Sequence, residues 1–329
     1  MPAQTLSRIS LSVMMAVAGS SVVFAQELVT VDGSSTVFPI SEAMAEEFQK
    51  ETGDRVTVGL SGTGGGFKKF CRGETDVTGA SRPISPSEVQ ACAEGNIEFI
   101  ELPVAMDGLA VVVNPDNDWA ECMTVEELGK MWEPAAQGTV DNWNQIREGF
   151  PDAPLRLFGA GTDSGTYDYF TLAVTGTEHS SRGDYTATED DNITVQGVST
   201  DVNALGFLGL AYLEENRDRM KAVAIRQEDG NCVLPTVETA GDGSYQPLAR
   251  PLFMYVNAER LDRPEVQAYA DFLMNPKHGT ELVAEVGYVP LPEKAFELGS
   301  QKVANRKTGT FFSEGAQIGV SIEDLLASE

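Results

Sequence analysis

The sequence predicts an α/β fold with two lobes, on three observations. Short runs rich in Val and Ile alternate along the chain with segments whose apolar residues recur at helical spacing. The 329 residues, 42% of them hydrophobic, are enough for two cores rather than one. Two similar apolar strands, 104–113 and 250–257, lie far apart in the chain, and each runs into an Asn. Strands that alternate with helices favour mainly parallel pairing.

The two similar strands suggest where the chain passes between lobes. We expect lobe I to contain residues 26–108 and 252–329, and lobe II, inserted between them, to contain residues 109–251. The alternative is two domains that follow one another along the chain.

The elements of the first part follow in order. Residues 28–31 form a strand, and a helix follows in which Val37, Ile40, Met44 and Phe48 share one face up to a stop at Gly53. The next segments are a strand at 55–60, a short helix with Phe67 and Phe70, a strand into the loop DVTGASRPIS, a helix from Glu88 to Ala93, and the strand runs IEFIELPV and GLAVVVN.

The second part continues the alternation after a longer interval. We expect a helix at 124–132, a strand at 154–161, a helix over TYDYFTLAV, a polar stretch at 176–192, a strand at 250–257 and a helix at 264–275.

The first 25 residues are typical of a secretory signal peptide. Arg8 supplies a positive start, Ile9 to Val17 is a short apolar run, and Val23 and Ala25 occupy the −3 and −1 positions of a cleavage site. A buried N-terminal helix or a membrane anchor is the alternative, although the apolar run is short for a spanning helix. We expect export through a cleaved signal peptide.

Charge narrows the range of partners. The net charge is −27, and cleavage after Ala25 would remove one Arg and no acid, to leave −28. This charge argues against nucleic acids and anionic membranes as partners.

The four cysteines, Cys71, Cys92, Cys122 and Cys232, contain no CxxC pair, and His179 and His278 are the only histidines. A zinc site is therefore not expected, and no metal or cofactor is predicted. In an oxidising compartment four cysteines suggest two disulfides, for which three connectivities exist. We favour Cys71–Cys92 and Cys122–Cys232, because each pair then lies inside one lobe; four free thiols are the alternative.

Three turns of Gly, Ser and Thr recur between a strand and a helix, at Gly33–Thr36, Ser61–Gly66 and Gly161–Thr166. Each helix start offers unpaired N–H groups and a positive dipole end, and Ser and Thr add hydroxyl donors. Together they form a predicted anion site. Arg82, after Gly-Ala-Ser, is a candidate to pair with an oxyanion. The alternatives are ordinary N-caps for the turns and a structural salt bridge for Arg82.

Competing motifs fail at particular positions. A dinucleotide-binding GxGxxG would need Gly where Phe67 stands, and a P-loop would need Gly-Lys followed by Ser or Thr, not Gly66-Phe67-Lys68-Lys69. A nucleophile elbow is excluded by Thr162 and Thr166. Asp163-Ser164-Gly165 has no second copy, which an aspartic protease would need. Residues 189–192 lack EF-hand spacing for calcium, so a solvated loop is favoured.

The chain resembles the periplasmic phosphate-binding proteins of high-affinity phosphate ABC transporters. The motifs that carry the resemblance are VDGSSTVFPI, SGTGGGFKKF, TDVTGASRPIS, LPVAMDGLAVVVN, GAGTDSGTYDYF and RPLFMYVN, in the family's order over nearly the whole mature chain. The resemblance implies a type II periplasmic binding protein, with two lobes joined by two crossover strands that close on phosphate. It implies no catalytic residue, and a monomer that delivers phosphate to a membrane permease.

The resemblance also implies a set of phosphate ligands. They are Ser35, Thr36 and Val37 at the first turn, Thr63 and Gly64 at the second, and Ser164, Gly165 and Thr166 at the third. Ser164 would thus donate hydrogen bonds rather than act as a nucleophile.

The sequence departs from the better-known branch at two positions. Arg82 stands where that branch has a proton-accepting Asp, and Ala160 stands where it has an Arg. One guanidinium is therefore expected at the site, moved from one lobe to the other. Asp107 or Asp163 is expected to accept the phosphate proton.

Two other functions stay open. The site could take another oxyanion, such as sulfate, arsenate, molybdate or a phosphonate. A secreted phosphatase or other hydrolase with Ser164 as nucleophile would need a base that no motif places. At about 0.15 M salt the Debye length is about 8 Å, so binding is expected to depend weakly on ionic strength despite the acidic surface.

Overall fold

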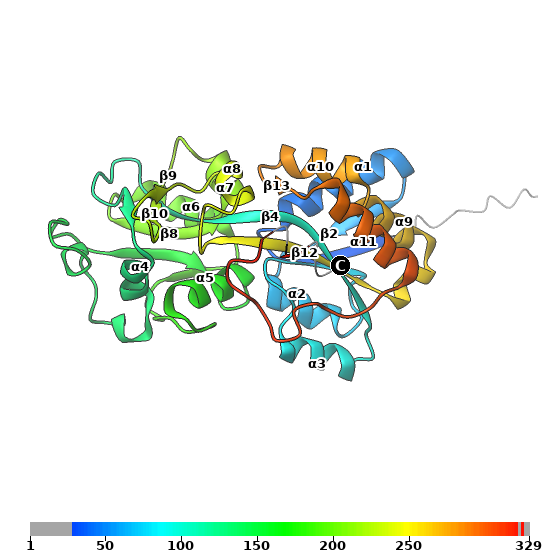
Figure 1. The fold of residues 1–329 in the computed structure, drawn as a ribbon. Coiled ribbons are helices and arrows are strands. Elements are labelled where there is room, and N and C mark those ends of the chain that lie inside the picture. The colour runs from blue at the N-terminus through cyan, green and yellow to red at the C-terminus, as the bar shows by residue number, and fades with distance from the viewer. Residues whose placement is uncertain (1–27, 322–323, 326–329) are drawn as a thin grey trace, which may run out of the picture.

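The computed structural model describes residues 28–321 and 324–325, and the predicted signal peptide lies outside them. The chain forms two bodies side by side, each with its own helices, and strands β4 and β12 run between them (Figure 1). One mixed sheet passes through both bodies in the order β2-β1-β3-β12-β4-β8-β6-β7, with β13 and β9 also pairing with β4.

The first body, which we call lobe I, contains both ends of the described chain (Figure 1). The part before the crossing comprises β1 (Leu28–Gly33), α1 (Phe38–Thr52), β2 (Arg55–Val58), α2 (Thr63–Phe70), β3 (Val77–Ala80) and α3 (Pro86–Glu94). The part after it comprises η3 (Glu259–Asp262), α9 (Pro264–Leu273), α10 (Pro276–Glu285), β13 (Val289–Pro290) and α11 (Glu293–Asn305).

Local sequence explains where these helices begin and end. Helix α1 buries Ile40, Met44 and Phe48 on one face, and Gly53 ends the helix with a left-handed φ of 82°. Ser85 and Glu88 form a capping box at the start of α3, in which each side chain binds the backbone N–H of the other.

The second body, lobe II, is built from the middle of the chain. Its elements are β5 (Cys122–Met123), α4 (Val125–Trp132), η1 (Pro134–Ala136), η2 (Trp143–Gln145), β6 (Arg156–Ala160), α5 (Gly165–Thr175), β7 (Thr186–Thr188), α6 (Asp191–Thr200), β8 (Ala204–Gly209), α7 (Leu210–Glu215), β9 (Lys221–Ala222), β10 (Ala224–Arg226), β11 (Cys232–Val233) and α8 (Val237–Gly241). A small sheet of β11, β10 and β5 lies apart from the main sheet.

The two crossing strands are β4 (Phe99–Val113) and β12 (Ala249–Asn257). The two expected runs IEFIELPV and GLAVVVN merge into the single strand β4, and every residue of both β4 and β12 is buried. The two strands are antiparallel neighbours from the Ala249–Gly108 pair to the Asn257–Phe99 pair.

Pairing in the main sheet is mixed rather than mainly parallel. The expected parallel pairing holds at both edges, between β1 and its neighbours β2 and β3 and between β6 and its neighbours β7 and β8. The centre is antiparallel, because β4 and β12 cross between the lobes in opposite directions.

Separate hydrophobic cores stabilise the two bodies. One core draws on residues 29–106 and 252–325, joined by Ala211 and Ala240, while two smaller cores draw on residues 109–248. The exact lobe boundaries remain a prediction, which these cores support.

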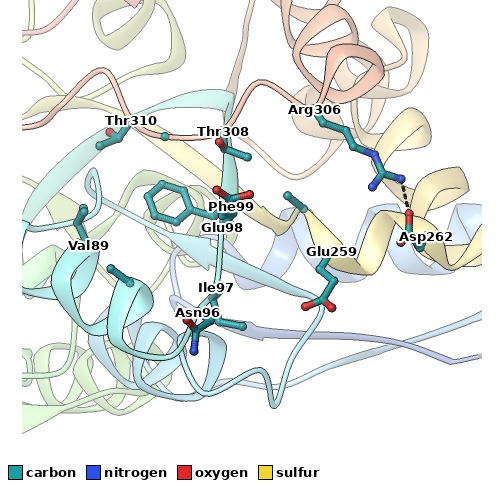
Figure 2. Close-up of a pocket in the computed structure, with 13 residues that line it drawn as sticks. Val89, Asn96, Ile97, Glu98, Phe99, Glu259, Asp262, Arg306, Thr308 and Thr310 are labelled. Atoms are coloured by element: carbon teal, nitrogen blue, oxygen red, sulfur yellow. Dashed lines mark hydrogen bonds and ion pairs between the residues drawn. The ribbon is translucent and has the colours of Figure 1, made fainter.

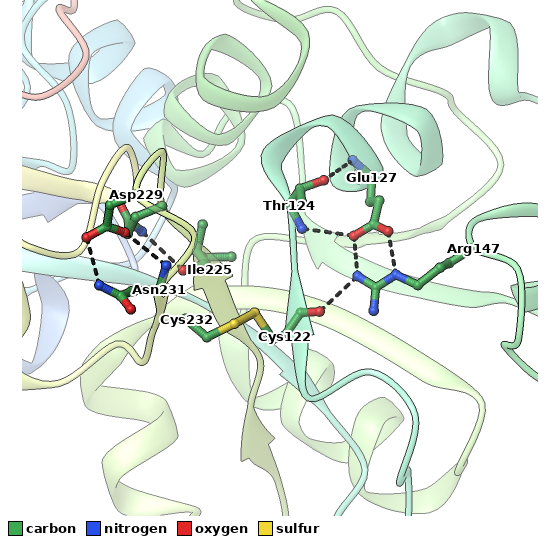
Figure 3. Close-up of a disulfide and its surroundings, with 9 residues drawn as sticks. Cys122, Thr124, Glu127, Arg147, Ile225, Asp229, Asn231 and Cys232 are labelled. Atoms are coloured by element: carbon green, nitrogen blue, oxygen red, sulfur yellow. Dashed lines mark hydrogen bonds and ion pairs between the residues drawn. A yellow bond between two sulfur atoms is a disulfide. The ribbon is translucent and has the colours of Figure 1, made fainter.

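Both predicted disulfides are confirmed. Cys71–Cys92 joins the end of α2 to α3, and Cys122–Cys232 joins β5 to β11 (Figure 3). Next to the second disulfide, Arg147 donates to the Glu127 carboxylate and, at 2.9 Å, to the Cys122 carbonyl. That ion pair fixes α4 against the loop that leads to β6.

The segment after α11 packs mainly on lobe I. Gly309 forms a bridge with Ile100 of β4, and the Thr310 hydroxyl donates to the buried Glu101 carboxylate at 2.5 Å. Further along, the Gly319 N–H donates to the Tyr169 hydroxyl of lobe II at 3.4 Å. Within the described residues no helix has the length and apolar character needed to cross a membrane.

Candidate anion site between the lobes

The first turn delivers Thr36 to the boundary between the lobes. Gly33 has a φ of +139° and passes so close to β3 that a Cβ atom would lie 2.2 Å from the Gly79 carbonyl oxygen, which only glycine permits. Thr36 is fully buried, and the Tyr288 hydroxyl donates to its carbonyl at 2.6 Å. The close approach of Gly33 to β3 and the hydrogen bond from Tyr288 therefore fix the position of the start of α1.

The second turn places Thr63 at the start of α2. Its hydroxyl lies 3.2 Å from the Ser81 hydroxyl and accepts from the Ser81 N–H at the same distance. The neighbouring Gly64 N–H donates to the Asp163 carbonyl of the third turn at 2.9 Å. Turns from different lobes are thus in direct contact.

The third turn begins α5. Ser164 is the N-cap, and its side chain accepts from the Thr166 N–H at 3.1 Å, which leaves the hydroxyl hydrogen free to donate elsewhere. A Cβ at Gly165 would lie 2.7 Å from both the Thr63 and the Ser81 hydroxyl oxygens, so glycine is needed where α5 meets lobe I.

Arg250 joins the first and third turns. The Thr36 and Thr166 hydroxyls lie 2.8 Å apart, and the Arg250 Nη2 group donates to Thr166 at 2.9 Å and to Thr36 at 3.3 Å. Its Nη1 group donates to the Gly165 carbonyl at 3.2 Å. All three side chains are fully buried, so these donors would act on an anion in a medium that screens charge weakly.

Asp107 holds Arg250 in place. The two residues face each other in the register of β4 and β12, and Asp107 Oδ2 accepts from Arg250 Nη2 at 2.9 Å and Nε at 3.1 Å. Asp107 Oδ1 accepts from the Leu210 N–H at 3.1 Å. Burial raises the pKa of the Asp107 carboxyl, and the Arg250 guanidinium opposes that rise.

Arg82 occupies a different position at the lobe boundary. It donates to Asp168 of α5 at 2.5 Å, to the Pro83 carbonyl at 3.0 Å and, through both terminal nitrogens, to Glu88 at 2.7 and 2.9 Å. Burial alone would lower the pKa of Arg82, but Glu88 and Asp168 outweigh that effect and raise the pKa above its ordinary value. Arg82 therefore ties α3 to α5, and most of its donors have protein partners.

The remaining residues of the first turn are also buried. The Ser35 carbonyl accepts from the Tyr212 hydroxyl at 3.2 Å. The Ser35 side chain lies near Asp191 of lobe II and lowers the pKa of that carboxyl. The Val37 N–H has a long contact of 3.4 Å with the Ser34 hydroxyl.

The ten residues predicted from the sequence lie at or near this boundary, but their roles as ligands remain predictions. Thr36, Asp107, Gly165 and Thr166 are linked through Arg250, whereas Arg82 forms a separate salt-bridge cluster. Asp163, the second candidate proton acceptor, pairs with Lys68 at 2.5 Å and is 46% exposed.

Sequence reasoning missed Arg250 and Ser81. Arg250 is the first residue of the otherwise apolar run 250–257. Asp107 is the charged residue within the other apolar run, 104–113. The two similar runs at 104–113 and 250–257 carry one charged residue each, of opposite sign, which could have indicated a pair. Arg182, in the polar stretch at 176–192, is buried within lobe II, where it binds Asp184 and the Val140 carbonyl.

An open surface pocket of about 780 Å³ lies elsewhere, on lobe I. It is lined by residues from α3, the start of β4, η3 and the segment after α11, including Ile97, Phe99 and Arg306 (Figure 2). Arg306 there binds Asp262 at 2.7 Å. None of the residues of the lobe boundary lines it, so its size does not make it the anion site. Among the described residues, no group of three or more His, Cys, Asp or Glu side chains could hold a metal ion.

The separate cores of the two bodies, the two crossing strands and the buried polar boundary define a two-lobed binding protein of the periplasmic type. A family model described as the PBP superfamily domain matches residues 18–277. The chain belongs to the PBP superfamily and, on the relatives described next, to the family of PstS phosphate-binding proteins within it.

Curated relatives match over most of their length. Protein SphX of Synechococcus elongatus is 50% identical over 303 residues, which are 92% of this chain and 89% of the relative. The phosphate-binding protein PstS of Staphylococcus saprophyticus is 35% identical over 269 residues, which are 80% and 81% of the two chains.

Solved structures are similar as well. A possible phosphate binding protein from Planctomyces limnophilus is 50% identical with a TM-score of 0.62, and covers 85% of this chain and 98% of its own. A protein from Clostridium perfringens, assigned as a phosphate ABC transporter substrate-binding protein and solved with bound phosphate, is 25% identical with a TM-score of 0.69. It covers 81% of this chain and all of its own.

Proposed function

We propose that this protein binds inorganic phosphate between its two lobes and delivers it to the membrane permease of an ABC transporter. The observation that carries the proposal is the convergence of three helix starts with the Arg250 guanidinium at one buried boundary. Helix N-termini, hydroxyls and a guanidinium are the groups that bind phosphate in proteins. The names of the PstS relatives and the bound phosphate in the Clostridium perfringens structure support the same ligand.

In this proposal the lobes open to admit phosphate and close around it. The hydroxyls of Thr36 and Thr166, now bonded to each other, donate to phosphate oxygens together with Arg250 Nη2. Thr63 and Ser164 add hydroxyls, and N–H groups of Ser35, Val37 and Gly165 complete the shell. The N–H groups of Gly64 and Thr166 join them once their bonds to the Asp163 carbonyl and the Ser164 hydroxyl open. The motion bends β4 and β12, the two strands that connect the predicted lobes. Lobe I comprises residues 26–108 and 252–329, and lobe II comprises residues 109–251.

We further propose that the protein acts without catalysis, as a monomer in the periplasm. The relatives are named as binding proteins, which supports a carrier rather than an enzyme. Ser164 serves as the N-cap of α5, and no base is among its hydrogen-bond partners in the described residues.

Calorimetric titration with phosphate, repeated with sulfate and arsenate, tests the proposal. Phosphate and arsenate have the same shape and protonation, so both should bind, and sulfate should bind more weakly. Thr166→Val should weaken phosphate binding about 10- to 100-fold, because a hydrogen bond to a charged group contributes about 1.5–3 kcal/mol.

Thr175→Val is the matched control in the same helix, since the Thr175 hydroxyl bonds only to backbone carbonyls of lobe II in the described chain. It should leave the dissociation constant unchanged. Heat from sulfate but not from phosphate, or equal effects of the two Thr variants, would contradict the proposal.

A further inference from the structure

Asp191 is a buried carboxylate at the lobe boundary that the proposed site does not use. It is the first residue of α6 and only 3% exposed, yet its Oδ2 atom has no hydrogen-bond partner in the described part of the chain. The helix does not need it as a cap, because the Asp190 carboxylate already accepts from the Asn192 N–H at 3.0 Å. A buried oxygen without a partner is costly and needs an explanation.

The groups around Asp191 give it no cation of its own. Arg250 of β12 interacts with it, but that guanidinium is already paired with Asp107 of β4. Asp190 adds a second like charge. Tyr212 of α7 and Tyr288, the residue before β13, are close enough to feel the charge of Asp191. The Ser35 side chain approaches Asp191 from lobe I and lowers its pKa.

Arg82, the second buried guanidinium at the lobe boundary, is also already paired with carboxylates. Arg82 is neutralised by Glu88 and Asp168. An ionised Asp191 beside a phosphate dianion would therefore place like charges together without a free cation between them, an arrangement that a low-dielectric site strongly disfavours.

Protonation removes this conflict. Burial raises the pKa of Asp191 to about 7, while the Ser35 hydroxyl and Arg250 oppose the rise and Asp107 and Asp190 add to it. An anion that arrives beside Asp191 raises its pKa further, so the neutral form is then favoured. A protonated carboxyl also gains an O–H donor, which an anion oxygen can accept.

We propose that Asp191 takes part in phosphate binding as a neutral carboxylic acid: one proton enters from solvent with the anion, and the Asp191 O–H donates a hydrogen bond to it. The inference rests on the proposed function, because it assigns a role at the same boundary. No covalent bond changes; the proton that Asp191 gains is lost by water or buffer. The affinity of the protein is thereby linked to pH through one residue of lobe II.

The test compares the wild type with Asp191→Asn by phosphate calorimetry between pH 6 and pH 9, in two buffers with different ionisation heats. Phosphate titrates in this range, but identically for both proteins, so the difference between them isolates Asp191. Asn keeps an N–H donor at every pH. Above pH 7 the wild-type dissociation constant should rise, relative to that of the variant, by up to about tenfold per pH unit. At pH 8 the wild type should take up as much as one more proton per phosphate.

Two further variants make the result specific. Asp190→Asn removes the adjacent, exposed charge; it should keep the pH dependence of the wild type, moved only slightly to lower pH, because Asp190 adds little to the rise in the pKa of Asp191. Asp191→Leu has no donor and should bind phosphate more weakly than Asp191→Asn at every pH.

Each outcome decides a different question. Identical pH profiles and proton uptake in the wild type and Asp191→Asn would overturn the role of Asp191 while phosphate binding stands. A wild type that binds phosphate at no pH would overturn the proposed function and this inference with it. A carboxylic-acid carbonyl band that appears in the infrared difference spectrum with phosphate, and is missing in Asp191→Asn, would support the proton's location directly.

Discussion

The surroundings of Arg250 and Arg82 differ, although both guanidiniums are buried at the lobe boundary. Arg250 has one carboxylate partner, Asp107, and directs its Nη2 group to the hydroxyls of two helix starts. Arg82 has two carboxylate partners, Glu88 and Asp168, and donates to no hydroxyl that the structure shows. Charge and burial alone therefore do not identify the arginine that would bind an anion. The number of carboxylates around it, and the donors left over, distinguish the two.

The largest effect is expected at Arg250. Arg250→Gln should weaken phosphate binding at least about 100-fold, since at least one charged donor is lost along with its positive charge. It should also lower the free energy of unfolding by about 3–5 kcal/mol, because Asp107 is left as an unpaired buried charge. Calorimetric titration and urea unfolding measure the two effects.

The double variant Asp107→Asn/Arg250→Gln separates these causes. It should recover much of the stability, because the unpaired carboxylate is gone, but none of the phosphate affinity. Restored affinity would mean that Arg250 only supports the fold.

Arg82→Gln should have a smaller effect on binding, below about tenfold in the dissociation constant, because the Arg82 donors mostly serve Glu88 and Asp168. Its effect on stability should resemble that of Arg250→Gln, about 3–5 kcal/mol, since Asp168 is buried as deeply as Arg82. A loss of affinity as large as that of Arg250→Gln would instead identify Arg82 as a phosphate ligand, as the sequence predicts.

His179 gives the stability of the Arg82 cluster a pH dependence. A hydrogen bond to Asp168 raises the pKa of His179, and burial partly offsets the rise. Because the pKa of His179 is higher in the folded than in the unfolded protein, protonated His179 stabilises the fold below about pH 6.5. This stabilisation is lost as the pH rises through the folded-state pKa of His179. The effect should stay below about 1 kcal/mol, because the His179 ring is 58% exposed and solvent screens it.

Unfolding by urea between pH 5.5 and pH 8.5 checks this prediction, with His179→Asn as the variant that lacks the charge. The variant should be less stable than the wild type at pH 5.5 and equal to it at pH 8.5. The same difference at both ends would show that His179 acts through packing.

The smallest effect is expected at the exposed ion pair between Lys68 and Asp163, which also joins the lobes. Lys68→Ala should change stability and phosphate affinity by at most about 1 kcal/mol, and 0.5 M salt should remove that change. The Gly64 N–H bond to the Asp163 carbonyl remains in this variant. A larger, salt-resistant loss would place Lys68 among the functional cations beside Arg250.

Much of the fold could be predicted from local sequence. Helix α1 follows from the spacing of Ile40, Met44 and Phe48, and the two disulfides follow from the division of the chain into lobes. The three helix starts could be found because Gly, Ser and Thr at a strand-to-helix turn have a local physical meaning.

The pairing of Asp107 with Arg250 could not be found in this way. It depends on the register of two strands separated by more than a hundred residues, and register is set by contacts along the whole of β4 and β12. The same long-range pairing makes the centre of the sheet antiparallel. The Asp191 environment is equally non-local, since its neighbours come from both lobes.

Both covalent cross-links lie within a lobe: Cys71–Cys92 closes a span of 21 residues in lobe I, and Cys122–Cys232 closes one of 110 residues in lobe II. Such links act chiefly on the unfolded chain, whose freedom they reduce. Neither disulfide joins the two lobes. The disulfides can therefore stabilise each lobe against denaturation without restricting the rotation of the lobes about β4 and β12. A periplasmic carrier of this kind would thus combine two durable lobes with a connection that no disulfide restrains.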